Sequence, residues 1–323
     1  MKNLTGDLLI TGGTGSLGKT LIKKILEETE IKRIIIFSRD ELKQLEVRNF
    51  FANNKRLRFF LGDVRDLPRL TLAMKEVEYV IHCAALKQVD TGEYNPFEFI
   101  KTNILGSQNV IEASMNSGVS NVIALSTDKA SSPINLYGAT KLTADKLFIS
   151  ANNYSQKLGT KYSVVRYGNV LNSRGSVIPI FKDCKISGKP ITITDERMTR
   201  FWITMEQAAN FVIESLLQME GGELYVPKIP SARIIDIAKI ISPNSKIEFT
   251  GIRPGEKLHE EMISEEDMIR TYVVDEKRLL VAPVIADWGY KIPSLKNLAG
   301  NAAYRSDTND LWLNDQDIYE LIK

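Results

Sequence analysis

The sequence contains few of the residues that bind metals or form disulfides. Its 323 residues include two cysteines and two histidines. These are too few for a disulfide framework and make a poor set of zinc ligands. We therefore expect no metal site, and we interpret Cys83 and Cys184 as small apolar fillers.

Long apolar runs and an excess of one charge are also missing. The longest apolar runs, such as IIIF, are far too short to cross a membrane, and the segment MKNLTGDLLITGG does not resemble a signal peptide. The 42 basic and 40 acidic residues leave a net charge of +2, which gives no electrostatic footprint for nucleic acid. These absences predict a cytoplasmic protein with no nucleic-acid or membrane partner.

Short β-branched runs alternate with helical segments in the first half of the chain. DLLITGG, KRIIIFS and EYVIHCAA are separated by segments such as GKTLIKKILEET. This alternation predicts an α/β fold with a Rossmann-type doubly wound parallel sheet. Prolines then interrupt the pattern. We expect a dinucleotide-binding domain over residues 1–168, rejoined by about residues 200–220, and a smaller mixed α/β substrate-binding lobe with the tail over residues 169–323.

A glycine-rich segment, TGGTGSLG, follows the first predicted strand, with Gly12, Gly15 and Gly18 spaced three apart. Glycines at this spacing allow a tight turn, a close approach of the backbone to a pyrophosphate, and close packing of the next helix. The position at the start of a βαβ unit favours dinucleotide binding over an ordinary loop. The cofactor contacts predicted here and after the third predicted strand are Gly12, Thr14, Gly15, Ser16, Leu17, Gly18, Asp63 and Val64.

The end of the second predicted strand indicates which dinucleotide is bound. An acid at this place would bind the ribose 2′-hydroxyl, but the sequence has Ser38 and Arg39, with Lys43 a turn later. A hydroxyl and a guanidinium suit a 2′-phosphate, so the segment favours NADP over NAD. Asp40 is the contrary signal, because a small shift of the strand end would make it the ribose ligand.

Tyr137 and Lys141 lie four residues apart in a segment that predicts a helix, so they share one face. An ammonium beside the phenol would lower its pKa and let it accept a proton from a substrate hydroxyl as hydride leaves. Such a pair is often only a packed helix face. Its place after a strand that ends in Ser126 and Thr127, where open α/β sheets bind ligands, favours the oxidising role.

Several motifs together resemble a known family. TGGTGSLG and YGATK resemble the extended short-chain dehydrogenase/reductase family. STDKA, INLYGATK, VVRYGNV, RGSVIP, MTRFWIT and IRPGEKLHE resemble more specifically the soluble UDP-N-acetylglucosamine 4,6-dehydratases that invert carbon-5. The resemblance runs from the amino terminus to about residue 259, with an echo at YRSDTNDLWL. It implies an NADP-dependent lyase, a UDP-sugar substrate and a homo-oligomer.

The resemblance also implies roles for five residues. Tyr137, assisted by Thr127 and Lys141, would take the carbon-4 hydroxyl proton as hydride passes to NADP. Asp128 would be the acid that protonates the carbon-6 hydroxyl, and Lys129 the base at carbon-5. Hydride would return to carbon-6, giving UDP-2-acetamido-2,6-dideoxy-β-L-arabino-hex-4-ulose. Lys129 must be neutral to act, and we expect burial and Lys141 to lower its pKa.

The resemblance places the loop AALKQVD beside the nicotinamide and the sugar. Gln88 and Asp90 stand where the family has a histidine and a proline, which leaves the configuration at carbon-5 open. Arginines are expected at the substrate diphosphate, because a guanidinium binds it in bidentate fashion, whereas Phe201 and Trp202 are expected in the core. The substrate contacts predicted are Lys87, Asn169, Arg197, Arg200, Arg253 and Glu256, and the further cofactor contacts are Ala84, Ala85, Lys87 and Asn103.

Three alternatives stay open at this point. A dehydratase that retains the carbon-5 configuration would resemble this sequence, although such enzymes tend to carry a glutamate in place of Lys129. A nucleotide-sugar epimerase or reductase of the same fold would need Tyr137 and Lys141 but has no use for Asp128 and Lys129, which would then form an ordinary surface ion pair. A non-catalytic dinucleotide sensor would often lack the tyrosine–lysine pair, which is intact here.

Overall fold

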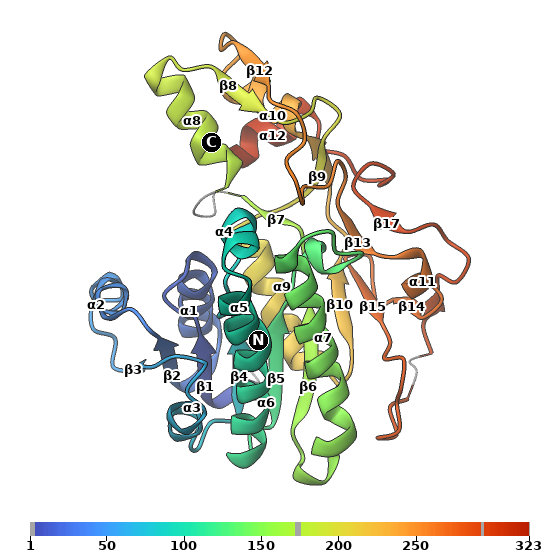
Figure 1. The fold of residues 1–323 in the computed structure, drawn as a ribbon. Coiled ribbons are helices and arrows are strands. Elements are labelled where there is room, and N and C mark those ends of the chain that lie inside the picture. The colour runs from blue at the N-terminus through green and yellow to red at the C-terminus, as the bar shows by residue number, and fades with distance from the viewer. Residues whose placement is uncertain (1–3, 172–175, 292–293, 323) are drawn as a thin grey trace.

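The computed structural model describes residues 4–171, 176–291 and 294–322. Its main feature in these ranges is a ten-stranded sheet with the order β16-β14-β15-β10-β6-β5-β4-β1-β2-β3. Its parallel strands are, in spatial order, β10, β6, β5, β4, β1, β2 and β3. Beyond β10, the strands β15, β14 and β16 continue the sheet in antiparallel fashion (Figure 1). The predicted Rossmann-type fold is confirmed.

The parallel part of the sheet is formed mainly by the first half of the chain. Its strands are β1 (Thr5–Thr11), β2 (Glu30–Ser38), β3 (Leu57–Leu61), β4 (Tyr79–His82), β5 (Asn121–Leu125), β6 (Lys161–Val165) and β10 (Leu224–Pro227). The antiparallel part consists of β14 (Thr271–Val273), β15 (Arg278–Val281) and β16 (Lys296–Asn297). Residues 7–11 of β1 and 34–38 of β2 are buried in unbroken runs, which is typical of parallel strands covered on both faces.

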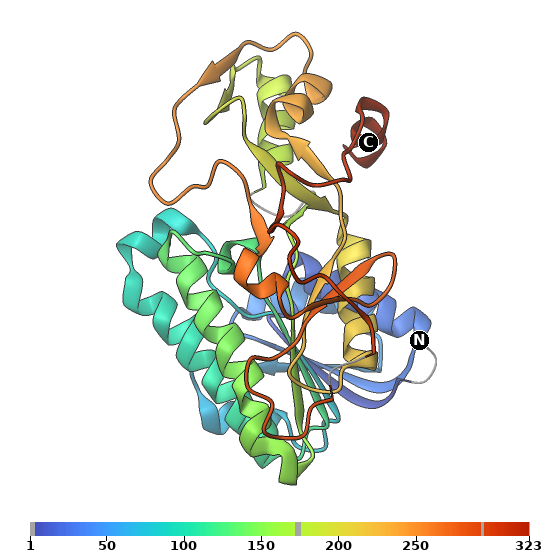
Figure 2. The same ribbon diagram turned by 90° about the vertical axis from the view of Figure 1, so that its right-hand side faces the viewer.

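Helices cover both faces of the sheet, as Figure 2 shows. On one face α1 (Ser16–Glu28) packs against α9 (Met205–Gln218), and on the other α6 (Gly106–Asn116) packs between α3 (Leu67–Ala73) and α7 (Leu136–Ser155). The remaining helices of this part are α2 (Glu41–Phe50), α4 (Val89–Tyr94), α5 (Pro96–Phe99), a π-helical turn η1 (Ile100–Leu105) and the short 3₁₀ turns η2 (Asp128–Ala130) and η3 (Gln156–Leu158). None of the helices in the described ranges could span a membrane, because none is both long and apolar enough.

A smaller lobe stands above the carboxyl ends of the parallel strands (Figure 1). It contains β7 (Asn169–Val170), α8 (Val177–Ser187), β8 (Ile191–Ile193), β9 (Thr199–Ile203), β11 (Ser231–Arg233), α10 (Ile234–Ile241), β12 (Ile247–Phe249) and α12 (Asp315–Ile322). The lobe has its own core around Trp202, whereas the neighbouring Phe201 belongs to the core of the main sheet. Both side chains are buried, which confirms that they are core residues. Residues 174 and 175 of the RGSVIP motif lie outside the described residues.

The chain crosses between the two parts more than once. After β9 in the smaller lobe, α9 and β10 return to the main layer, and β13 (Glu261–Ile263) then contacts η2 beside the start of α7. β13 pairs with β17 (Tyr304–Arg305) and is followed by α11 (Glu265–Met268). The division at residue 168 therefore stays a prediction, and the contact of β13 with η2 is the one that builds the site.

A buried ion pair ties these segments together. Asp145 on α7 lies 3.1 Å from the Arg166 guanidinium at the end of β6, and both side chains are less than 5% exposed. Asp145 also accepts a hydrogen bond of 2.7 Å from Ser126, and Arg166 donates one of 2.9 Å to the Met262 carbonyl on β13. This pair fixes α7 and β13 behind the candidate site.

We predict that Asp145→Ala lowers the free energy of unfolding by about 3 kcal/mol or more, because it leaves the Arg166 charge buried without its carboxylate. Urea denaturation measures the change. The control is Asp236→Ala, which removes the partner of the exposed Arg233 at 2.7 Å and should change the free energy by no more than about 1 kcal/mol. Equal losses in the two variants would contradict the structural role of the buried pair.

Candidate active site

The glycine-rich segment forms a tight loop between β1 and α1. Gly12 has a φ of +68°, and a Cβ at this position would lie 3.0 Å from the Ala84 backbone. A Cβ at Gly18 would overlap the Gly13 carbonyl, so the helix packs directly on the turn. The first turn of α1 begins at Ser16 and has no side-chain cap. Its N–H groups are therefore available to a phosphate, as a dinucleotide requires, and Thr14 and Leu17 are half-buried in the same loop.

The proposed ribose end of the cofactor site lies after β2. Ser38 is buried, and Arg39 is half-exposed with its guanidinium 3.5 Å from Asp63. Asp40 caps α2, since it accepts a hydrogen bond of 3.0 Å from the Lys43 N–H and pairs with the Lys43 ammonium at 2.9 Å. The Asp40 carboxylate and the Lys43 ammonium therefore engage each other at the start of α2, whereas the half-exposed Arg39 guanidinium contacts Asp63. Val64, after β3, is buried.

The loop after β4 carries Ala84, Ala85 and Lys87 towards the centre of the site. The Ala84 N–H donates to the Thr11 hydroxyl at 3.2 Å. Asn103, which is buried in η1, accepts from the Leu86 N–H at 2.8 Å and donates to the Leu86 carbonyl at 2.9 Å and to Thr140 at 3.0 Å. The Asn103 amide thus fixes the loop against α7.

Tyr137 and Lys141 both lie in the first half of α7, as the spacing predicts. Burial raises the pKa of Tyr137 to about 12, although Lys129 lowers it. The expectation that Lys141 lowers this pKa is wrong for the structure, since the cation that acts on the phenol is Lys129 and burial outweighs it. Burial also lowers the pKa of Lys141, against the opposing charge of Asp145.

Lys129 lies between two carboxylates. Its ammonium is 3.1 Å from Asp128 Oδ1 and 3.0 Å from Glu260 Oε1. Thr127 donates a hydrogen bond of 2.9 Å to the same oxygen of Asp128. The second oxygens, Asp128 Oδ2 and Glu260 Oε2, are buried and have no hydrogen-bond partner in the described part of the chain. Buried oxygens of this kind are costly unless a ligand completes them.

The pKa values of the three groups shift in different directions. Burial raises the pKa of Asp128 above its ordinary value, although Lys129 opposes this effect. Burial alone would lower the pKa of Lys129, but the charges of Asp128 and Glu260 outweigh it and raise the pKa above its ordinary value. Burial therefore acts in the expected direction, but the expected net lowering of the Lys129 pKa is wrong. For Glu260 burial is outweighed by Lys129 and Arg200, which together lower the pKa of this carboxyl.

Arg200 on β9 is buried and engaged within the protein. Its guanidinium donates to the carbonyls of Thr199 and Leu258 at 2.7 and 3.1 Å and to the Lys257 carbonyl at 3.0 Å. It also lies 3.5 Å from Glu260. Arg200 is therefore fixed in place and, after Lys129, contributes to lowering the pKa of the Glu260 carboxyl.

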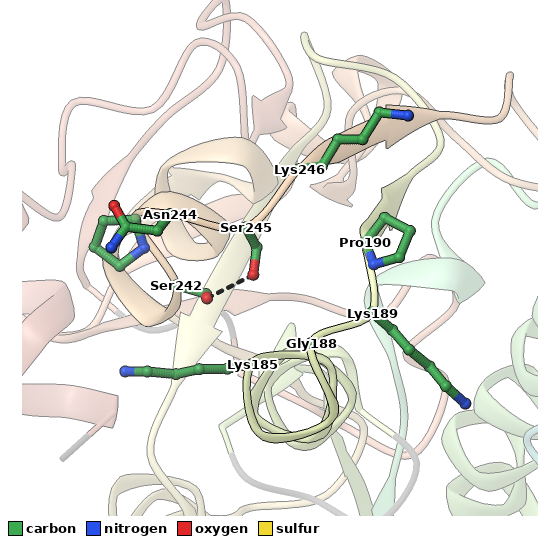
Figure 3. A pocket seen from close by; sticks show the side chains of 9 residues that line it. Lys185, Gly188, Lys189, Pro190, Ser242, Asn244, Ser245 and Lys246 are labelled. Atoms are coloured by element: carbon green, nitrogen blue, oxygen red, sulfur yellow. Dashed lines mark hydrogen bonds between the residues drawn. The ribbon is translucent and has the colours of Figure 1, made fainter.

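A cavity of about 270 Å³ opens above this cluster. Arg197 is not among its lining residues; it is exposed and paired with Asp195 at 2.8 Å. A larger hollow of about 480 Å³ lies elsewhere, in the smaller lobe, where Figure 3 shows the side chains of Lys185, Lys189 and Lys246 pointing away from one another. The predicted residues that line the cavity above the cluster are Lys87, Lys129, Asn169, Arg200, Arg253 and Glu256.

Lys257 and Glu260 also line this cavity, and neither is predicted from the sequence. The signal was present, since both lie within the motif IRPGEKLHE, and Glu260 is its last residue. Nothing in the spacing, however, indicates that residue 260 meets residue 129. That contact depends on β13 reaching η2.

Comparison with known proteins identifies the family. Residues 8–281 match the family described as polysaccharide biosynthesis protein. The chain belongs to this family. Among its relatives, the chain is similar to an inverting UDP-N-acetylglucosamine 4,6-dehydratase of Campylobacter jejuni, at 50% identity over 98% of this chain and 97% of that protein. It is also 44% identical to a UDP-glucose 4-epimerase of Rickettsia akari, over 81% of this chain and 79% of that one.

Solved structures of similar proteins share the fold of this family member. Pen from Bacillus thuringiensis has a TM-score of 0.89 and 36% identity, with 98% of each chain covered. DesIV from Streptomyces venezuelae, a dTDP-glucose 4,6-dehydratase solved with NAD, has a TM-score of 0.70 and 22% identity, with 78% of this chain and 86% of that chain covered. The likeness to DesIV, at 22% identity, concerns the fold alone.

We predict that Gly12→Ala weakens binding of the dinucleotide by about tenfold or more, because the new methyl group displaces the Ala84 loop from the cofactor site. Titration of the purified protein with NADP, followed by tryptophan fluorescence, measures this loss. Gly118→Ala is the matched control: Gly118 has a similar φ of +70°, but a Cβ there meets nothing within 4 Å. Equal affinities in the two variants would argue against the glycine loop as the cofactor site.

Proposed function

We propose that the protein is a UDP-N-acetylglucosamine 4,6-dehydratase that inverts carbon-5, as the relatives from Campylobacter jejuni are named. The observation that carries the proposal is the Lys129 ammonium within 3.1 Å of both Asp128 and Glu260, with Lys129 and Glu260 lining the cavity. Epimerisation has no need of an acid and a base beside the tyrosine, whereas elimination of water requires both.

The residues divide the proton transfers between them. Tyr137 accepts the carbon-4 hydroxyl proton, with Thr127 and Lys141 placing and supporting it. The nicotinamide, when bound, supplies the acceptor and later the donor of the hydride that leaves carbon-4 and returns to carbon-6. The resulting ketone acidifies the carbon-5 proton, which Lys129 removes. Asp128, whose pKa is raised by burial, gives its proton to the departing carbon-6 hydroxyl.

The substrate diphosphate and its nucleoside occupy the remainder of the cavity in this proposal. Lys87 and Arg253 supply positive charge, Asn169 supplies an amide at the diphosphate, and Glu256 binds ribose hydroxyls. Arg200 acts by holding Glu256 and Glu260, at 3.6 and 3.5 Å. We place Arg197 outside this set, because it does not line the cavity.

NADP is the dinucleotide that the site favours. The support is the exposed guanidinium of Arg39 together with the engagement of Asp40 as the cap of α2. Structural neighbours of the same fold carry NAD, so the preference rests on the residues of this chain. A homo-oligomer and a cytoplasmic location stay predictions.

Incubation of the protein with UDP-N-acetylglucosamine in deuterated water tests the function directly. We expect the product to lose one water, to carry deuterium at carbon-5, and to show the inverted configuration there by NMR. Unchanged mass with a new configuration at carbon-4 would indicate an epimerase, and a retained configuration at carbon-5 would indicate the other class of dehydratase. The control is Lys129→Ala, which should lose at least about 10²-fold in the rate of water loss.

We predict that Arg39→Ala weakens NADP binding by about tenfold and leaves NAD binding nearly unchanged, because only the 2′-phosphate needs the guanidinium. Parallel calorimetric titrations with both dinucleotides measure this difference. Arg48→Ala, a change on the same edge of the protein where the guanidinium stacks on Phe59, serves as the control. Equal affinity of the unmodified protein for NAD and NADP would remove the preference.

A further inference from the structure

The proposed reaction assigns no proton transfer to Glu260. Its carboxylate extends from the residue before β13 and lies 3.0 Å from the Lys129 ammonium. The side chain is 2% exposed, and its second oxygen is buried without a partner in the described ranges. Leaving a charged oxygen in this state is costly, which indicates a function in the site.

Lys129 needs a partner to act as a base. It must be a neutral amine when it removes the carbon-5 proton, but in the structure it is an ammonium between two carboxylates. Because these charges raise its pKa, release of the proton to water is unfavourable near neutral pH. The proton therefore needs an acceptor within the cavity.

Asp128 cannot be this acceptor, because it must bring its own proton to the departing hydroxyl. The pKa values of the two carboxyls shift in opposite directions: burial raises that of Asp128, whereas Lys129 and Arg200 lower that of Glu260 against the effect of burial. Its Oε1 already touches the ammonium, so the proton has no distance to diffuse.

We propose that Glu260 accepts the ammonium proton of Lys129 when the sugar fills the cavity, which frees the amine to remove the proton from carbon-5. This inference rests on the proposed dehydratase function. In the step an N–H bond of Lys129 breaks, an O–H bond forms on Glu260, and the two charges cancel. Exclusion of water by the sugar favours the step, because an ion pair loses more solvation than the neutral pair does.

Lys129 and Asp128 of the same cluster then supply the base and the acid for the elimination of water. The Lys129 amine takes the carbon-5 proton, and the electron pair of that C–H bond forms the double bond to carbon-6 as the C–O bond breaks. Asp128 gives its proton to the departing hydroxyl, which leaves as water. Lys129 is now a cation and Asp128 an anion, and their contact of 3.1 Å stabilises both charges as they form.

Several charged groups around the cluster bear on the proton transfer. Arg200 is a positioning residue, because three backbone carbonyls hold its guanidinium beside Glu260. Lys257 donates a hydrogen bond of 2.6 Å to the Ser131 carbonyl. The titratable and charged groups that face Lys129 or Glu260 are Lys87, Asp128, Tyr137, Arg200 and Lys257.

The test is the pH dependence of water loss in Glu260→Gln, measured with UDP-N-acetylglucosamine in single turnovers of the cofactor-loaded enzyme. In the unmodified protein the proton moves internally, so the rate should change little around neutral pH. In the variant the Lys129 proton must pass to solvent. We expect a loss of about 10²-fold at neutral pH, and a recovery of about tenfold for each unit of increasing pH until Lys129 is neutral.

Two further variants make the result decisive. Glu261→Gln changes the adjacent carboxylate, which accepts hydrogen bonds of 2.6 and 2.7 Å from Ser131 and Ser132, and it should keep the flat profile. Glu260→Asp should restore a flat profile at a lower rate, which tests the inference even if the glutamine variant folds poorly.

The outcomes separate this inference from the proposed function. A rate for Glu260→Gln that equals the unmodified rate, or that is lowered by the same factor at every pH, overturns the inference and leaves the dehydratase proposal standing. If the unmodified protein forms no 4-keto product from UDP-N-acetylglucosamine, both are wrong.

Discussion

The candidate site depends on one interaction, the contact of the Lys129 ammonium with two buried carboxylates. Asp128 is its neighbour in sequence, whereas Glu260 comes from a segment that reaches it only through the fold. Three ionisable groups at these distances cannot titrate independently. Burial raises the pKa of Asp128, and Lys129 and Arg200 lower the pKa of Glu260. The cluster thus stores both an acid and a proton acceptor at one end of the cavity.

The fold places that cluster at the same edge of the sheet as the glycine-rich loop. The parallel sheet brings the glycine loop, the loop after β4 and the segment after β5 to the same edge, because the carboxyl ends of parallel strands meet there. Asp145 and Arg166 connect α7 to β13 from behind. The smaller lobe closes the cavity from above with Arg200 and residues 253–257. The candidate site forms because these segments meet at the carboxyl edge of the parallel sheet.

The sequence predicts those parts of the molecule that local spacing determines. The βαβ rhythm, the glycine loop and the tyrosine–lysine pair on one helix face all follow from periodicity or from contacts within a few residues. Glu260 could not be found in this way, because its partner lies 131 positions earlier in the chain. The pKa directions are also beyond the sequence: burial alone would lower the pKa of Lys129, but the charges of Asp128 and Glu260 together raise it. Arg197 and Arg200 are equivalent candidates in the sequence. The structure distinguishes them, because Arg200 is buried and Arg197 is exposed.

The central claim is that Asp128 and Lys129 face the sugar ring. A crystal structure of the protein with NADP and UDP-N-acetylglucosamine tests it most directly. The account predicts the Asp128 carboxyl within hydrogen-bonding distance, about 3 Å, of the carbon-6 hydroxyl, and the Lys129 nitrogen beside carbon-5. A sugar bound with both side chains directed away from it would contradict the account.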